Sequence, residues 1–172
     1  MPSGLFLQKI NLDYYYPPFL ERVLQLKAAC LARGVKYLTT CGFRSWGESH
    51  QLHLKYLQGG PRAAPAGLSA HNYGLGDDSA LIVKESPKRV CRWDDGDFDI
   101  LGIEAARLGL IWGGNFKDGP HVNWPGFTNG TELQPLLKVW RDHQNLLLVP
   151  RLRKVWDYVD EHGPKLPPLR LS

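Results

Sequence analysis

The chain has 172 residues, a formal net charge of +4, and 43% hydrophobic and 22% charged residues. This length and composition suggest one folded domain and exclude a disordered or fibrous protein. The three cysteines are an odd number with no CxxC pair, which argues against a disulfide framework and against a cysteine-built zinc site. No stretch approaches about 18 consecutive apolar residues, so the sequence predicts no membrane span.

The two ends of the chain differ in character. Residues 1–9 lack a basic segment that leads into an apolar stretch, so we expect no Sec signal peptide. Residues 133–172 hold seven Lys/Arg against four Asp/Glu, which is most of the net charge. A modest basic excess favours polyanionic surroundings such as nucleic acid, anionic lipid or cell-wall polymer. The alternative interpretation is a solvated helix face.

The first half of the chain predicts two helices and a strand before a long loop. In order, we expect a helix opened by Pro17-Pro18 and ended near Gly34, a strand over 35–41, a turn over 42–45 and a helix from Trp46 to about Gln58. Residues 59–76 are rich in Gly, Pro and Ala and have no periodicity. Long irregular loops inside compact domains are usually functional.

The second half predicts short strands among helices. We expect a buried strand over 79–83, a charged turn-like stretch over 84–97 and a helix that is capped by Asp97 or Asp99 and runs to about Leu108. A final strand should follow over 121–124, and two helical stretches broken at Pro150 should begin at Thr131. Strands interrupted by unrelated helices and loops indicate an α+β domain with a largely antiparallel sheet.

Two of the six histidines stand in segments that suggest a metal site. His71 and Asp78 lie seven residues apart across two glycines, which let the backbone turn tightly. His121 follows Trp112-Gly-Gly and Asp118 and could be a third ligand. A catalytic zinc site needs three such ligands and an open position for water, and a free carboxylate such as Asp118 could take a proton from that water. The alternative is that both histidines only form hydrogen bonds in loops.

The spacing Ser-x-His-x-x-Gly-x-(Ala/Gly)-x-Asp, followed by Trp-Gly-Gly and Asp-x-Pro-His, resembles the zinc peptidases of the D-alanyl-D-alanine carboxypeptidase and L-alanyl-D-glutamate endopeptidase family. That family shares a superfamily with lysostaphin-type enzymes and the hedgehog signalling domain. Gly42-Phe-Arg-Ser45 looks like a further family motif, so the resemblance runs from about Gly42 to Trp124. Two departures are Gly76, where alanine is common, and a short interval before Asp118.

The resemblance implies a small antiparallel sheet flanked by helices and one zinc ion. It implies that His71, Asp78 and His121 bind the zinc, that Asp118 is the general base and that Arg44 contacts substrate. Residues 1–130 would form the catalytic domain, and residues 131–172 a C-terminal helical extension packed on it or appended to it.

The implied activity is hydrolysis of the peptidoglycan stem peptide, first of all at the L-Ala–D-Glu bond. The alternatives are D-Ala-D-Ala carboxypeptidase activity and a non-catalytic zinc-containing binding module. The chain looks like a phage endolysin, so we expect a monomer without nucleic-acid partners that stays in the host cytoplasm and reaches the cell wall after release. The basic C-terminal segment could make weak contact with the anionic envelope.

The remaining candidates have weaker patterns. Ser69 and Asn72 flank His71 and could orient it. Cys41 is interpreted as a buried structural thiol. The segment from Arg151 to Trp156 alternates positive and apolar residues, which fits a surface helix attracted to an anionic envelope. The alternative for this segment is one more helix face buried on the domain, formed by Leu152, Val155, Trp156 and Val159.

Overall fold

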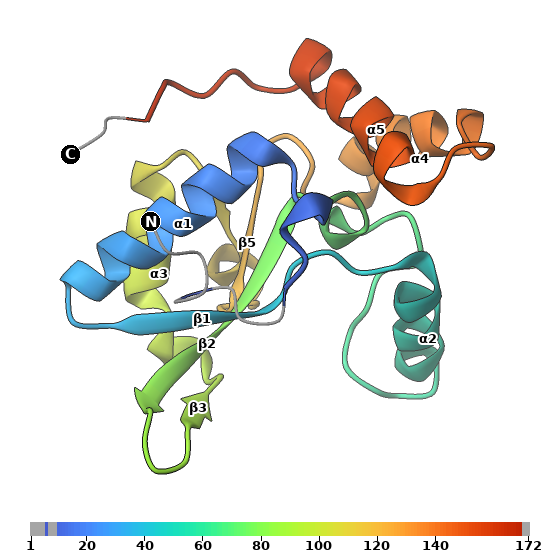
Figure 1. The fold of residues 1–172 in the computed structure, drawn as a ribbon. Helices are drawn as coiled ribbons and strands as arrows, with labels where there is room; N and C mark the ends of the chain where they lie inside the picture. Colours follow the sequence, from blue (N-terminus) through green and yellow to red (C-terminus); the bar gives the residue numbers. More distant parts are fainter. Residues whose placement is uncertain (1–5, 7–9, 170–172) are drawn as a thin grey trace.

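The computed structural model describes residue 6 and residues 10–169 (Figure 1). The N-terminal stretch without a signal-peptide pattern lies outside these described residues, apart from Phe6. The helices are α1 (Pro17–Ala32), α2 (Trp46–Leu57), α3 (Asp99–Arg107), α4 (Gly130–Asp142) and α5 (Leu148–His162), and the strands are β1 (Lys36–Cys41), β2 (Gly76–Lys84), β3 (Val90–Arg92), β4 (Ile111–Trp112) and β5 (His121–Asn123). Short 3-10 helices are η2 (Leu12–Tyr14), η3 (Ala70–Tyr73), η4 (Asp95–Asp97) and η5 (Gly113–Phe116).

One antiparallel sheet organises the fold. Its strand order is β1-β2-β5-β4, and β3 pairs with β2 outside this path. Helices α1 and α3 lie together beside the sheet, while α2 stands apart from it and α4 and α5 pack on each other (Figure 1). The expected α+β class with a largely antiparallel sheet is therefore confirmed.

Helix α1 shows how the sequence builds the core. Pro17 stands at its first position, where the fixed φ of proline suits a helix and its missing N–H costs nothing. Phe19, Val23 and Leu26 then recur at helical spacing and are completely buried. The chain leaves the helix through Gly34, whose φ of +80° lies in the left-handed region that favours glycine.

The C-terminal helices share this core. Leu152, Val155, Trp156 and Val159 of α5 are buried and belong to the same hydrophobic cluster as Phe19. This is the arrangement expected if the segment forms a buried helix face, and Arg153 and Lys154 are exposed on the opposite side. Residues of α4 and α5 thus complete a core that residues 1–130 do not enclose by themselves.

Two helix boundaries differ from the sequence-based expectation. The break between the last two helices lies over residues 143–147, and Pro150 is inside the first turn of α5. Proline is tolerated there because the first N–H groups of a helix have no intrahelical acceptor. Neither Asp97 nor Asp99 caps α3, because Phe98 is the N-cap residue, its side chain makes no cap hydrogen bond, and Asp99 already belongs to the first turn.

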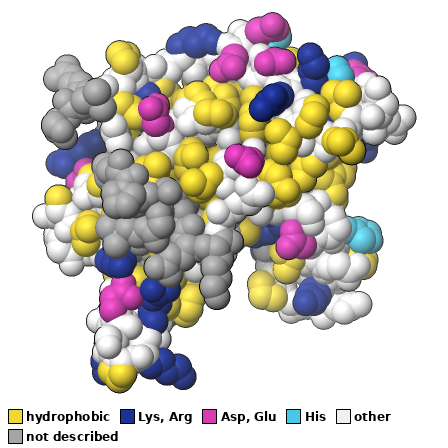
Figure 2. Space-filling view, viewed as in Figure 1, with side chains coloured by type: hydrophobic (Ala, Val, Ile, Leu, Met, Phe, Trp, Pro, Cys, Tyr) yellow, Lys and Arg dark blue, Asp and Glu magenta, His cyan; other side chains and the backbone are white. Residues whose placement is uncertain are grey.

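The charged stretch expected to be turn-like carries strand β3 and forms a hairpin with β2. The exposed residues of this hairpin include the cations Lys84, Lys88, Arg89 and Arg92, and Figure 2 shows the dark blue side chains at the lower left. The chain therefore has a cluster of positive side chains outside the C-terminal segment. None of the helices in the described part of the chain has the length and apolar character needed to cross a membrane.

Candidate metal centre

Three chain segments bring His71, Asp78 and His121 together. Asp78 lies in β2 and His121 begins β5, and the two residues are direct partners in the antiparallel register. His71 lies in η3, which closes the long loop just before β2. Cross-strand partners have neighbouring side chains, so the sheet register itself places a carboxylate beside an imidazole.

One carboxylate oxygen contacts both histidines. Asp78 Oδ1 lies 3.2 Å from His71 Nε2 and 2.8 Å from His121 Nδ1. The two imidazole ring centres are 5.1 Å apart. His71 is buried, whereas Asp78 retains 25% of its side-chain exposure, so the group is reached from one side.

The orientation of His71 is fixed by the backbone behind it. Its Nδ1 donates a hydrogen bond to the carbonyl oxygen of Gly42 at 2.6 Å. A carbonyl can only accept, so Nδ1 carries a proton and Nε2 is the nitrogen left to bind an ion beside Asp78. Histidine ligands of metals are usually held in this way, with the second ring nitrogen bonded to a carbonyl or carboxylate.

The electrostatics favour the charged forms of this pair in the metal-free protein. Burial disfavours the Asp78 carboxylate, but the charge of His71 and the hydrogen bonds from His121 and His71 outweigh it and hold the pKa of Asp78 well below its usual range. Burial also disfavours the His71 imidazolium, but the Asp78 carboxylate outweighs it and raises the pKa of His71 well above its ordinary value. A metal ion would therefore replace a proton on His71.

The distance of Asp78 from each histidine fits two ligands of one tetrahedral ion. Ligand atoms about 2.0–2.1 Å from such an ion lie roughly 3.3 Å from one another. The separations of 3.2 Å and 2.8 Å between Asp78 Oδ1 and the two imidazole nitrogens are close to that value. Two histidines and one carboxylate leave a fourth position open, as a catalytic metal site requires. On these two separations, His71, Asp78 and His121 are the candidate ligands of one metal ion.

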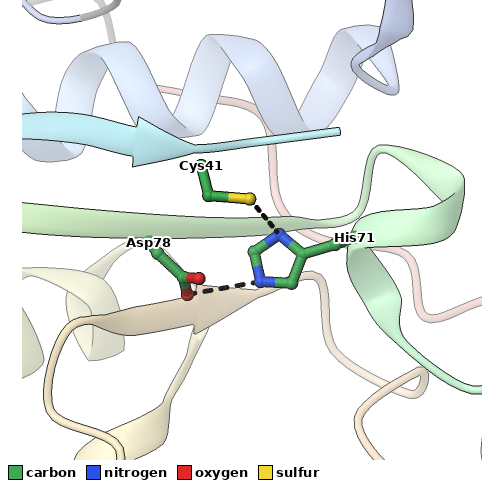
Figure 3. A group of neighbouring side chains, drawn as sticks. All are labelled: Cys41, His71 and Asp78. Carbon is green, nitrogen blue, oxygen red and sulfur yellow. Dashed lines mark hydrogen bonds and ion pairs between the residues drawn. The ribbon is translucent and has the colours of Figure 1, made fainter. Parts of the chain in front are cut away.

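Cys41 is a neighbour of this group that the sequence did not reveal. Its Sγ, one nitrogen of His71 and one oxygen of Asp78 all lie within 4.8 Å of one another. Figure 3 shows the thiol on the Nδ1 side of the ring, 3.9 Å away, and Asp78 on the Nε2 side. Because Nδ1 already bonds to Gly42, the thiol does not face the nitrogen that is free to bind an ion.

Cys41 is half-buried rather than enclosed, so the expectation that its thiol is buried is wrong. Its position follows from the register, since Cys41 is the β1 partner of Asp78 across an irregularity after Thr39. A single sequence carries no signal for that pairing.

Arg44 lies beside the same carboxylate. Its Nη2 is 3.5 Å from Asp78 Oδ2 and 3.4 Å from Cys41 Sγ. The guanidinium therefore faces the oxygen of Asp78 that the histidines do not contact. With 21% of its side chain exposed, Arg44 stands at the border between the metal ligands and solvent.

Asp118 lies in the exposed turn before β5. Its backbone carbonyl accepts a hydrogen bond from the backbone N–H of His121 at 3.1 Å, and its own N–H donates to the carbonyl of Gly113 at 2.9 Å. Lys117 precedes it with a φ of +64°, a conformation that costs energy in a residue other than glycine. The exposed ring of Phe116 lies 6.3 Å from the His121 ring. The turn therefore ties the backbone of Asp118 to that of His121 and places the Phe116 ring near the His121 ring.

Asn72 fastens the loop around the first ligand. It is completely buried, its Nδ2 donates to the backbone carbonyl of Arg44 at 2.9 Å and to Ser49 Oγ at 2.8 Å, and its Oδ1 accepts from the N–H of Gly67. The side chain of Ser69 makes no cap hydrogen bond to η3. Asn72, rather than Ser69, therefore holds η3 against α2.

Comparison with known proteins places the chain in a family. No protein-family model matches it. It is 37% identical over 125 residues to the peptidoglycan L-alanyl-D-glutamate endopeptidase CwlK of Bacillus subtilis (strain 168). The aligned region covers 62% of this chain and 71% of CwlK. The crystal structure of the L-Ala D-Glu endopeptidase ChiX of Serratia marcescens aligns with a TM-score of 0.45 and 18% identity, over 71% of this chain and 92% of that one. By its identity to CwlK over most of that relative's length, the chain belongs to the family of peptidoglycan L-alanyl-D-glutamate endopeptidases.

Proposed function

We propose that this chain is a zinc-dependent peptidase that hydrolyses the L-Ala–D-Glu bond of the peptidoglycan stem peptide. The observation that carries the proposal is the contact of Asp78 Oδ1 with His71 Nε2 and His121 Nδ1, at 3.2 Å and 2.8 Å. The relative CwlK, which is named as an L-alanyl-D-glutamate endopeptidase, supports the choice of bond.

Zinc suits the three ligands better than the other common divalent ions. Imidazole nitrogens favour zinc and other transition metals, whereas calcium and magnesium prefer sites made of oxygen atoms. Zinc has no redox chemistry and takes three protein ligands with an open fourth position in hydrolases. A bound zinc ion would polarise the scissile carbonyl and make a water molecule more acidic.

The other polar residues have separate tasks in this proposal. Asp118, exposed in the turn that precedes His121, takes a proton from the attacking water and returns it to the leaving amine. Arg44 binds a substrate carboxylate or stabilises the developing oxyanion, for which its planar guanidinium is suited. Phe116 is exposed beside His121 and offers an apolar surface to the substrate.

Mass spectrometry of digested peptidoglycan tests the function. New N-terminal D-Glu supports the endopeptidase, and released D-Ala identifies a D-Ala-D-Ala carboxypeptidase instead. If the zinc-loaded protein leaves the masses of the peptidoglycan fragments unchanged, it is a binding module. The Asp118→Asn variant is the control, because it removes the proton acceptor and leaves all three ligands in place.

We also propose that the exposed cations of α5 make weak contact with the anionic envelope after release from the host cytoplasm. Arg153 and Lys154 are exposed, whereas Arg151 lies over the Trp140 ring at 4.0 Å and donates to the Trp140 carbonyl. Reversing both charges with Arg153→Glu and Lys154→Glu should weaken binding to whole sacculi at low salt and spare hydrolysis of a soluble muropeptide. Unchanged binding to sacculi would refute the contact.

A further inference from the structure

A fully buried ion pair lies directly behind the metal centre. Lys27 of α1 and Asp77 of β2 are both without exposed side-chain area, and Lys27 Nζ is 2.9 Å from Asp77 Oδ2. Lysine and aspartate are rarely fully buried, and a buried ion pair is costly to desolvate. Asp77 immediately precedes the candidate ligand Asp78. A charged pair at this place therefore needs an explanation beyond stability.

The Asp77 carboxylate receives hydrogen bonds from three further side chains. Its Oδ1 accepts from the Tyr15 hydroxyl at 2.9 Å and from Thr39 Oγ1 at 2.8 Å. Its Oδ2 accepts from Ser79 Oγ at 3.2 Å, and Lys27 also donates to Ser79 Oγ. The carboxylate thus ties together α1, β1, β2 and the segment before α1. A network satisfied to this degree holds its members in one arrangement.

The network affects the position of Asp78 because Asp77 and Asp78 are consecutive residues of β2. Successive side chains of a strand point to opposite faces, so Asp77 turns toward α1 and Asp78 turns toward the two histidines. The register between β1 and β2 is irregular between Thr39 and Cys41, opposite Ser79 and Asp78. Thr39 and Ser79 both bond to Asp77, so the network fixes the strand on each side of this irregularity.

The same network reaches His71 through Tyr15. A Cβ atom at Gly42 would overlap the Tyr15 hydroxyl, so the Tyr15 side chain lies directly against the Gly42 backbone. The Gly42 carbonyl is the acceptor that orients His71 Nδ1. The hydroxyl that donates to Asp77 therefore also supports the backbone on which the first ligand depends.

We propose that Lys27, Asp77 and Tyr15 position the metal ligands Asp78 and His71 from the far side of the sheet. They are positioning residues, because they touch neither the ion nor the substrate. The inference rests on the proposed metal site. It predicts that zinc affinity depends on residues that the family motifs of this sequence do not include.

The decisive variant replaces both charges by apolar residues of similar size, Lys27→Met with Asp77→Leu. Such a replacement of a buried pair is often neutral or stabilising, but here it also leaves the hydroxyls of Tyr15, Thr39 and Ser79 without their acceptor, so the fold is checked first by circular dichroism. We expect zinc affinity, measured by competition with a chromophoric chelator, to fall about 10–100-fold, the usual effect of losing an outer-shell partner. The visible spectrum of the Co²⁺-loaded variant should also change, because it reports the arrangement of the ligands.

Tyr15→Phe tests the network without removing a charge, and Tyr37→Phe is its matched control. Tyr37 is also a completely buried tyrosine whose hydroxyl donates a hydrogen bond, at 2.7 Å, but to the carbonyl of Asp97. Tyr15→Phe should weaken zinc binding severalfold, and Tyr37→Phe should leave it unchanged. If the double variant does not fold, Tyr15→Phe decides the question alone.

Two results would overturn the inference while leaving the proposed function intact. A folded double variant with wild-type zinc affinity and an unchanged Co²⁺ spectrum means that the pair only stabilises the core. Equal effects of Tyr15→Phe and Tyr37→Phe mean that the loss is not specific to the network. A wild-type protein that binds no zinc overturns the proposed function and this inference with it, which distinguishes that failure from the other two.

Discussion

The backbone N–H of Arg44 donates a hydrogen bond to the backbone carbonyl of His71 at 3.0 Å. The residue expected to contact substrate is therefore fastened to the residue expected to bind the metal. Its guanidinium also lies 3.5 Å from Asp78 Oδ2. The backbone hydrogen bond and the ion pair thus join Arg44, His71 and Asp78 in one connected group.

This relationship makes a prediction for Arg44. Arg44→Ala should retain zinc, because it removes no ligand, but it should lower turnover of peptidoglycan. Arg44→Lys should restore little of the activity, since an ammonium cannot reproduce the planar fork of a guanidinium. Steady-state rates and zinc content measured on the same preparations check both statements. Full restoration by lysine would show that only the positive charge matters.

The ligand set is tested by removing its members one at a time. The purified protein should carry about one zinc ion per chain, and His71→Ala, Asp78→Ala and His121→Ala should each lose most of it, because only three protein ligands hold the ion. Elemental analysis measures the loss. His50→Ala is the control, since His50 is exposed on α2. Full zinc in His121→Ala would exclude this ligand set.

Asp118→Asn separates proton transfer from metal binding. The variant should keep its fold and its zinc and lose roughly 10²–10⁴-fold in rate, the usual contribution of a positioned general acid or base. The rate of muropeptide hydrolysis and the zinc content check this. Turnover close to wild type would mean that Asp118 only shapes the turn before His121.

Zinc binding should release protons. The Asp78 carboxylate raises the pKa of His71 well above its ordinary value, so the imidazole of the metal-free protein keeps its proton to a higher pH than a free imidazole does. Because zinc binds the neutral imidazole, binding should displace this proton, and affinity should rise with pH until the pKa of His71 is passed. Calorimetry in buffers of different ionisation enthalpy measures the released protons, and an enthalpy independent of buffer would contradict the prediction.

The His71–Asp78 pair makes the stability of the metal-free protein depend on pH. The raised pKa of His71 contributes stability that is fully present below pH ~6.5 and is lost as the pH rises through the folded value. The lowered pKa of Asp78 contributes stability that is present above pH ~3.9 and is lost as the pH falls through its folded value. The difference in melting temperature between the metal-free wild type and the metal-free His71→Ala variant should therefore be largest between these two pH values. An equal difference at all pH values would contradict the assignment.

Removal of α5 should damage the whole protein. A chain ending after Pro150 loses Leu152, Val155, Trp156 and Val159 from the core. We expect a lower melting temperature, lower solubility and equal losses on soluble muropeptide and whole sacculi. Intact hydrolysis of the soluble substrate by the truncated chain would show instead that α5 is a dispensable appendage.

The sequence predicted which candidate residues lie close together better than it predicted the structure around them. The residues His71, Asp78, His121, Asp118 and Arg44 stand in motifs with fixed spacing, and the structure brings the first three and Arg44 into contact. Helix α1 and strand β1 were found because proline, glycine and apolar periodicity mark them locally. The predicted and observed bounds of these two elements agree because the residues that mark each element lie within a few positions of one another in the sequence.

The features that the sequence did not reveal depend on residues far apart in the chain. Cys41 meets His71 only through the register of β1 with β2, and Asp77 meets Lys27 across 50 residues. Strand β3 was missed because it spans only Val90–Arg92, and three residues are too few to show an alternating pattern. The expected helix break at Pro150 was wrong because proline breaks a helix at most positions but is tolerated in the first turn, where Pro150 lies.

The contact between Trp156 and Tyr73 bears on how the chain is made. Trp156 Nε1 donates a hydrogen bond to the Tyr73 carbonyl at 2.8 Å, so the last helix touches the short helix that carries His71. During synthesis from the N-terminus, every candidate ligand leaves the ribosome before α5 does. The nascent chain therefore contains all its candidate ligands before the residues of α5 can cover the core. A ribosome-bound chain that stops before Trp156 should accordingly be sensitive to protease at η3, and a released chain that includes α5 should be protected there.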